Sequence, residues 1–175
     1  SLRGVRIGLR SDNTLEHSHF SGLKGGVKRL VIPRILRLYD SWHPVGSLAA
    51  DYLVEMAGVE RPVYYFPYAA DVAWFARESS NWAGRRGEEL AQWGWQASDF
   101  VILGVLKWHP REDPLTLVRA FLQVAAARSQ ARLVLVGDGE LRGVIETALA
   151  GYQASVHLPG YLPYSQLPRY YAVCD

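Results

Sequence analysis

The sequence predicts an α/β protein built around a parallel, doubly wound sheet, because strand-like and helix-like segments alternate along it. In the second half, apolar runs at 100–106, 132–137 and 155–158 are separated by segments with helical spacing. The run at 100–106 (FVILGVL) is apolar throughout, as expected for a strand buried on both faces of a parallel sheet. Strands that are connected through helices in this way pair in parallel. Residues 100–175 are therefore expected to contain three strands of one sheet.

The first half predicts a second, smaller unit of the same kind. Strands are expected at 5–9 (VRIGL), within YDSWHPV and at 62–66 (PVYYF). A helix is expected at 26–38, where Pro33 kinks or shortens it, and another at 46–58, which ends at Gly58. The polar, glycine-containing segment 79–99 is expected to be a connector with one helix, which divides the chain into 1–78 and 100–175.

Composition excludes several classes of protein. The net charge is only +2, which argues against a nucleic-acid-binding protein. The single cysteine, Cys174, cannot form an internal disulfide and favours a reducing, cytoplasmic location. The sequence contains neither a metal-ligand spacing nor an apolar run of about 18 residues that would span a membrane.

The connection after the first strand of the second half, VLKWHPREDP (105–114), is unusually rich in charge. Asp113 and Pro114 predict the start of a helix, with Asp113 as its cap. Lys107 and Arg111, together with that helix N-terminus, could form a cradle for phosphate groups. A solvated, capped loop explains the same charges, and both interpretations stay open.

Two further turns carry candidate binding residues. Gly137 and Gly139, in VLVGDGEL, either let backbone amides approach a phosphate or sugar, or simply form a tight turn. A dinucleotide-binding fingerprint is disfavoured because its third glycine position holds Arg142. Beyond the first strand, Arg10–Asp12 lie where substrate-contacting residues often occur, although turn chemistry explains Ser and Asp there equally well.

The segment 20–39 contains Lys24, Lys28, Arg29, Arg34 and Arg37 and no acidic residue before Asp40. A basic amphipathic helix can bind anionic lipid headgroups. The segment 24–37 is therefore a candidate for a peripheral membrane contact, with a solvated basic face as the alternative.

The order of three blocks in the second half resembles the retaining family 4 glycosyltransferases of GT-B architecture. The blocks are VLKWHPREDPLTLVRAF, ARLVLVGDGEL and SVHLPGYLPYSQLPRYYAVCD. Earlier, LRSDNTLEH, YDSWHPVGSLAADYLVEMAG and VYYFPYAADVAWF resemble the closing part of that family's N-terminal domain. The resemblance implies two Rossmann-like domains, both incomplete here. Residues 1–78 would belong to the acceptor-side domain and 100–175 to the first half of the nucleotide-sugar donor domain.

The resemblance also implies roles for single residues. Lys107 matches a basic residue that grips the donor diphosphate, whereas the family's second basic residue, five positions later, is replaced by Glu112. The family's glycine before the first basic residue is Leu106, and Arg111 lies close enough to Glu112 to substitute partly. Other implied contacts are with the donor nucleotide or sugar (Gly137, Asp138, Gly139, Gly160, Tyr161) and on the acceptor side (Arg10, Ser11, Asp12).

The implied reaction is transfer of a sugar from a nucleotide diphosphate sugar, with retention, by a hexosyltransferase-type enzyme. The family needs no metal, and the nucleotide sugar is a co-substrate rather than a cofactor. The family's glutamate pair and acceptor loop would lie outside these residues, so the catalytic residues stay unassigned and the chain alone is expected to be inactive. A non-catalytic relative that binds a nucleotide sugar or a partner is the alternative, motivated by Glu112 and Leu106.

Overall fold

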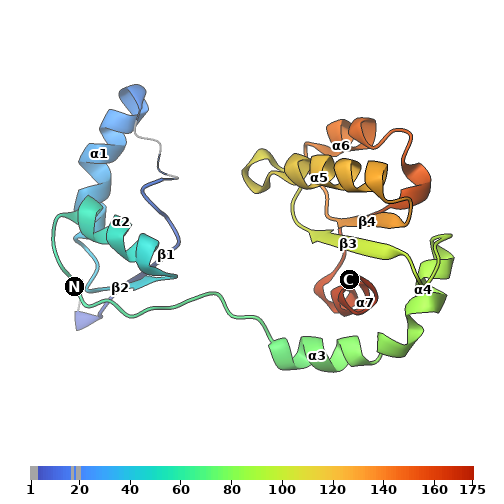
Figure 1. Cartoon of the computed structure of the whole chain (residues 1–175). Coiled ribbons are helices and arrows are strands. Elements are labelled where there is room, and N and C mark those ends of the chain that lie inside the picture. The colour runs from blue at the N-terminus through green and yellow to red at the C-terminus, as the bar shows by residue number, and fades with distance from the viewer. Residues whose placement is uncertain (1–3, 17, 19–20) are drawn as a thin grey trace. The chain divides into compact units, whose positions relative to one another are not determined.

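The computed structural model describes residues 4–16, 18 and 21–175, and it confirms the α/β class with parallel sheets. The chain divides into two compact units, one up to Ala70 and one from Asp71 onward (Figure 1). Each unit carries its own parallel sheet, with two strands in the first and three in the second.

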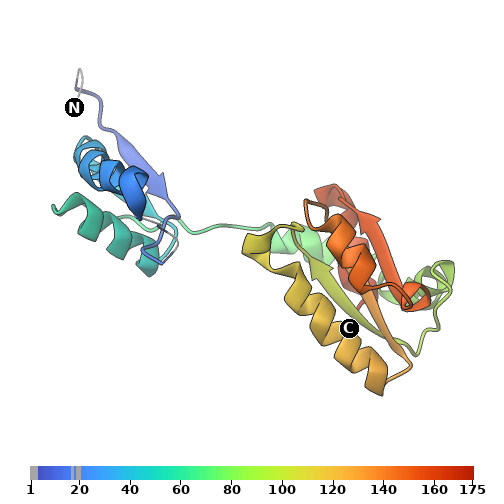
Figure 2. The same ribbon diagram turned by 90° about the horizontal axis from the view of Figure 1, so that it is seen from above.

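In the first unit, β1 (Gly8–Ser11) pairs in parallel with β2 (Ser41–Pro44). Helices α1 (Gly22–Leu36) and α2 (Ser47–Ala57) accompany this sheet (Figure 2). Alternation along the strands turns Leu9 and Trp42 toward the helices, because successive strand residues face opposite sides. The helix α2 ends as expected: Gly58 adopts a left-handed conformation and donates its N–H to the Val54 carbonyl at 3.0 Å. The core consists of Leu36, Trp42, Tyr52, Leu53 and Ala57.

Three predictions for the first unit were wrong in their limits. The first strand was expected at 5–9, but β1 begins at Gly8 because its partner β2 begins opposite, at Ser41. Before that point Ile7 donates its N–H to the Asp40 carboxylate and accepts the Asp40 N–H, and the apolar Val5 is 63% exposed. The segment 62–66 runs beside β2 but forms a single bridge, between Trp42 and Val63. Helix α1 begins four residues earlier than expected, at Gly22, and continues through Pro33 to Leu36.

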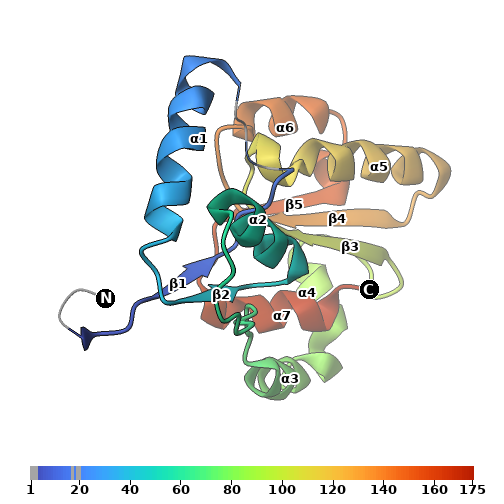
Figure 3. The ribbon, with the colours of Figure 1, turned by 90° about the vertical axis from the view of Figure 1, so that its left-hand side faces the viewer.

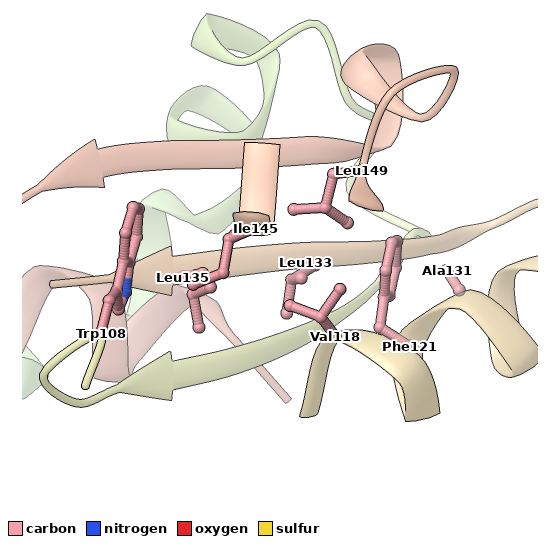
Figure 4. Packing of buried hydrophobic residues seen from close by; sticks show 8 residues of the cluster. All are labelled: Trp108, Val118, Phe121, Ala131, Leu133, Leu135, Ile145 and Leu149. Carbon is pink, nitrogen blue, oxygen red and sulfur yellow. The ribbon is translucent and has the colours of Figure 1, made fainter. Parts of the chain in front are cut away.

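In the second unit, β3 (Phe100–Val105), β4 (Ala131–Val136) and β5 (Val156–Gly160) pair in parallel in that order. Helices α5 (Pro114–Ala127) and α6 (Arg142–Ala148) cover one face of the sheet, and α7 (Leu167–Val173) covers the other (Figure 3). Phe121 of α5 and Ile145 of α6 pack onto Leu133 and Leu135 of β4 (Figure 4). Trp108 closes this core beyond the end of β3.

The segment 79–99 is not a free connector, because much of it packs into the second unit. Helix α3 (Val72–Ser80), a short 3₁₀ turn (η2, Ala83–Arg85) and α4 (Arg86–Gln92) lead into β3. Leu90 and Trp95 are buried against Val101. The carboxylate of Glu89 is buried as well, and it forms an ion pair with Arg169 of α7. The boundary between the units therefore falls between Ala70 and Asp71, and the assignment of the units to acceptor and donor sides stays a prediction.

Candidate functional site

A cavity of about 390 Å³ lies where β3 and β4 end. In parallel α/β sheets, ligands bind at the carboxyl ends of the strands, and a cavity of this size is typical of small-molecule sites. Its wall comes from the turns after β3 and β4 and from the chain that follows β5. The lining residues are Val105, Leu106, Lys107, Glu112, Val136, Gly137, Asp138, Tyr161, Leu162, Tyr164 and Leu167.

The shape of the cavity depends on close contact between the turn after β3 and the turn after β4. A Cβ atom at Gly137 would lie 1.9 Å from the carbonyl oxygen of Leu106, and one at Gly139 would lie 2.4 Å from that of Trp108. Both glycines also have positive φ, at 138° and 159°, which other residues rarely adopt. The amide of Trp108 donates to the Asp138 carbonyl at 2.9 Å, which locks the two turns together. The glycines are therefore needed to let the two backbones touch.

The backbone amide of Lys107 points away from β4. Its neighbours Leu106 and Trp108 donate to the carbonyls of Val136 and Asp138, at 3.1 and 2.9 Å. Because backbone groups alternate in direction along a strand, the Lys107 N–H between them is turned to the other side. There it donates to the Glu112 carboxylate at 2.8 Å. The acid that replaces the expected second basic residue thus satisfies the amide of the first.

Other side chains of the same connection also cap backbone amides. The ring Nδ1 of His109 accepts the Arg111 N–H at 3.1 Å, and Asp113 accepts both the amide and the hydroxyl of Thr116, at 3.3 and 2.7 Å. Asp113 was predicted to cap α5, and it does so. The Asp113 carboxylate thus accepts one backbone amide of the N-terminal turn of α5. The expectation that this helix N-terminus attracts a phosphate stays a prediction.

Asp138 and Arg142 form a fixed pair beside the cavity. The guanidinium of Arg142 contacts both carboxylate oxygens of Asp138, at 2.9 and 2.8 Å, and also reaches Glu146 at 3.1 Å. The hydrogen bond from Arg142, with a second from the Gly139 amide, lowers the pKa of Asp138. The guanidinium also lies over the Trp108 ring, 4.8 Å from its centroid. Arg142 therefore braces the turn, because its charge is engaged by two carboxylates.

The part of the cavity wall that follows β5 is aromatic and aliphatic. Tyr161 is 78% exposed at the rim, whereas Tyr164 is held from behind by α3. Its ring stacks on Trp74, with centroids 5.0 Å apart, and meets Phe75 edge-on at 4.9 Å. Such contacts fix the orientation of an aromatic side chain. Sequence reasoning missed Tyr164, Leu162 and Leu167 as lining residues, since nothing in their spacing distinguishes a cavity wall from a core.

The cavity brings together five of the residues that the sequence singled out on the donor side. They are Lys107, Glu112, Gly137, Asp138 and Tyr161. Arg111, Gly139 and Gly160 do not line it. Arg111 lies on the 3₁₀ turn η3 (Pro110–Glu112), Gly139 packs against Trp108, and the Gly160 carbonyl accepts the Gly137 amide at 2.9 Å. Among the described lining residues, Lys107 is the one cation.

The predicted acceptor-side residues lie in the first unit, at the end of β1. The Arg10 guanidinium lies over the rings of Phe66 and Tyr68, at 5.2 and 4.7 Å from their centroids. The Tyr68 hydroxyl donates to Asp12 at 2.6 Å, and this hydrogen bond raises the pKa of Tyr68. Ser11 is buried, and its hydroxyl oxygen accepts the Asn13 amide at 3.2 Å. Arg10 and Asp12 thus belong to one exposed aromatic and charged cluster, whereas Ser11 stabilises the turn.

Comparison with known proteins agrees with this fold. The fold is that of a part of a GT-B glycosyltransferase: the structure superimposes on the crystal structure of Anabaena HepE in complex with UDP and glucose, with a TM-score of 0.70 at 15% identity. The match covers 97% of this chain and 45% of HepE, so the chain spans less than half of that protein. Residues 97–175, which hold the cavity, match the family model of Glycosyl transferases group 1. No curated protein matches the chain.

Two other kinds of feature are absent from the described residues. They contain no group of three or more side chains placed to hold a metal ion. Within the same residues, no helix has the length and apolar character needed to cross a membrane.

The contact between the two turns predicts the effect of one methyl group. Gly137→Ala should lower the free energy of unfolding by about 3 kcal/mol or more, because the new Cβ collides with backbone and the conformation is strained. Gly143→Ala is the matched control: it lies in α6 with open space around it and should change stability by about 1 kcal/mol or less. Urea unfolding measures both. Equal stabilities of the two variants would contradict the close approach.

Proposed function

We propose that the chain is part of a retaining, family 4 glycosyltransferase, and that the cavity of the second unit binds the nucleotide diphosphate sugar. One observation carries the proposal. The cavity lies at the carboxyl ends of β3 and β4, within the residues that match the glycosyltransferase family model. The reaction would transfer a hexose to an acceptor with retention of configuration. HepE was solved with UDP and glucose, so UDP-sugars are the first donors to test.

The lining suits a ligand with a flat, apolar end and a charged end. Tyr161, Tyr164 and Leu162 offer surface for a nucleobase or ribose, while Lys107 adds a positive charge to the same lining. A cation there would stabilise the negative charge that develops on the leaving diphosphate, which is the main electrostatic task in such a transfer. Arg111, on the adjacent turn, would assist from outside the lining. Neither a metal nor a cofactor is proposed beyond the nucleotide sugar itself.

The first unit is proposed to serve the acceptor. Arg10 and Asp12, with the aromatic rings around them, form an exposed polar and aromatic cluster at a strand end. Planar rings and charged groups together are suited to a sugar-like or anionic acceptor. Because the chain spans 45% of HepE, the catalytic residues are not assigned here, and we expect the 175 residues alone to be inactive.

A second candidate function is favoured by Glu112. A carboxylate inside a proposed diphosphate site opposes the binding of phosphate, as it would in a relative that holds nucleotide sugars weakly or has become a binding protein. Turnover of a nucleotide sugar by the full-length protein would exclude this candidate. Donor binding without turnover would support it.

We also propose a cytoplasmic location, in keeping with the free, partly buried Cys174, and a peripheral contact with anionic membranes through 24–37. Helix α1 exposes both cations, such as Lys28 and Arg34, and apolar side chains, such as Leu23 and Leu30. The side chain of Lys24 lies outside the described part of the chain. An interfacial helix carries these two kinds of side chain on separate faces. In α1 they are spread around the helix, so the expected amphipathic pattern is not observed and the proposed contact rests on the basic charge.

The membrane contact predicts salt-sensitive binding. The protein should co-sediment with vesicles of phosphatidylserine and phosphatidylcholine and be released as salt rises, because surface charges are screened over about 10 Å at 0.1 M. Changing both Lys28 and Arg34 to Ser should weaken binding by about tenfold or more, since each cation contributes about 1 kcal/mol. The control changes Arg119 and Arg128, exposed cations of the second unit, in the same way. Equal losses in both double variants would refute a contact through α1.

The donor site predicts a specific role for Lys107. Lys107→Ala should weaken the binding of nucleoside diphosphates by about tenfold, because a unit charge about 4 Å from a phosphate contributes between about 1 and 4 kcal/mol, depending on solvent exposure. Titration calorimetry with UDP, GDP and ADP measures the loss. Arg119→Ala removes an exposed cation from α5, outside the cavity, and should have less than a twofold effect. Unchanged affinities for Lys107→Ala would remove the cavity as the diphosphate site.

A further inference from the structure

The proposed phosphate end of the cavity already contains a carboxylate. Glu112 lines the cavity beside Lys107, and its side-chain oxygen accepts the Lys107 backbone N–H at 2.8 Å. That amide is turned away from β4, so within the described structure its acceptor comes from the cavity side. A carboxylate and a phosphate oxygen compete for the same kind of donor. The position beside Lys107 that is best suited to an anion is therefore occupied by a group of the chain itself.

We propose that Glu112 is a specificity-determining residue that occupies this anion position, so that a phosphate group must displace it to reach the Lys107 amide. The proposal rests on the proposed function only in taking the natural ligand to be a nucleotide sugar. It adds the means by which the cavity selects against the more highly charged ligands. While Glu112 accepts the Lys107 amide, the cavity can bind the base and sugar. The diphosphate can bind beside Lys107 only after the Glu112 side chain rotates away.

The surroundings of Glu112 permit such a movement. The residue is exposed and ends the 3₁₀ turn η3, and its backbone amide is held separately by the His109 carbonyl at 3.0 Å. The side chain can therefore rotate without unfolding the turn. A solvent-exposed hydrogen bond of this kind costs little to exchange for another acceptor.

The other caps of the same connection differ from Glu112 in position. His109 and Asp113 also accept backbone amides, but neither lines the cavity. Their capping role is complete without any ligand. Of these three side chains, Glu112 alone both accepts a backbone amide and lines the cavity. A ligand in the cavity can therefore displace Glu112, whereas His109 and Asp113 are purely structural caps.

Two substitutions distinguish the charge of Glu112 from its hydrogen bond. Glu112→Gln keeps an acceptor for the Lys107 amide and removes the charge, whereas Glu112→Ala removes both. Glu140→Gln is the matched control, because Glu140 is an exposed acid beside His109 that does not line the cavity. Each full-length variant is titrated calorimetrically at one salt concentration with inorganic pyrophosphate and, separately, with UDP.

The expected result is that Glu112→Ala binds pyrophosphate about tenfold more tightly than the unaltered protein, as removal of one nearby like charge implies. The pyrophosphate affinity of Glu112→Gln should lie between those of the unaltered protein and Glu112→Ala if the hydrogen bond also matters. It should equal that of Glu112→Ala if charge dominates. Glu140→Gln should change affinity less than twofold. In nitrogen-15 NMR spectra, hydrogen exchange of the Lys107 amide should become faster in Glu112→Ala, while the rest of the spectrum verifies the fold.

Equal pyrophosphate affinities in the unaltered protein and both Glu112 variants, including no binding in any of them, would overturn the role of Glu112. An equal gain in Glu140→Gln would also overturn it, since the effect would then be a general one of net charge. The proposed function fails in a different way, namely if UDP binds no more tightly than pyrophosphate in every variant. The two failures can therefore be told apart.

Discussion

The site depends on the contact between the turn after β3 and the turn after β4. The carbonyl oxygen of Leu106 would lie 1.9 Å from a Cβ at Gly137, so glycine is required there. Hydrogen bonds from Trp108 to Asp138, and from Gly137 to Gly160, then tie the ends of three strands into one rim. Buried Trp108 supports this rim from the core below. Without this contact, the donor-side residues would sit on separate loops and would not share a cavity.

The same contact determines which way the Lys107 amide points. Because the two flanking amides donate to the last residue of β4 and to the turn after it, the amide of Lys107 is turned outward, to the side where Glu112 accepts it. Arg142 also belongs to the rim, because it forms an ion pair with Asp138 and its guanidinium lies over the Trp108 ring. The charges of Arg142 and Asp138 are thus paired with each other within the rim. Lys107 is left as the cation of the described lining, which makes the proposed donor site a weakly charged one.

Local patterns in the sequence predicted the fold better than they predicted the site. The apolar runs gave all three strands of the second unit, and Asp113 and Gly58 act as the predicted caps. The first strand and the segment 62–66 were misplaced because pairing depends on where the partner strand begins. The link between Glu112 and the Lys107 amide depends on side-chain direction, and the stack of Tyr164 on Trp74 joins residues distant in sequence. Neither of these two contacts produces a periodic pattern in the sequence from which it could be predicted.

Hydrogen–deuterium exchange with and without UDP tests most directly whether this rim is the nucleotide site. The account predicts that UDP slows exchange in three separate segments, 105–112, 136–139 and 160–167, because they wall one cavity. Segment 28–36 of α1 should be unaffected. Exchange that slows in none of the three segments, or in only one of them, would contradict a shared donor cavity at the ends of the strands.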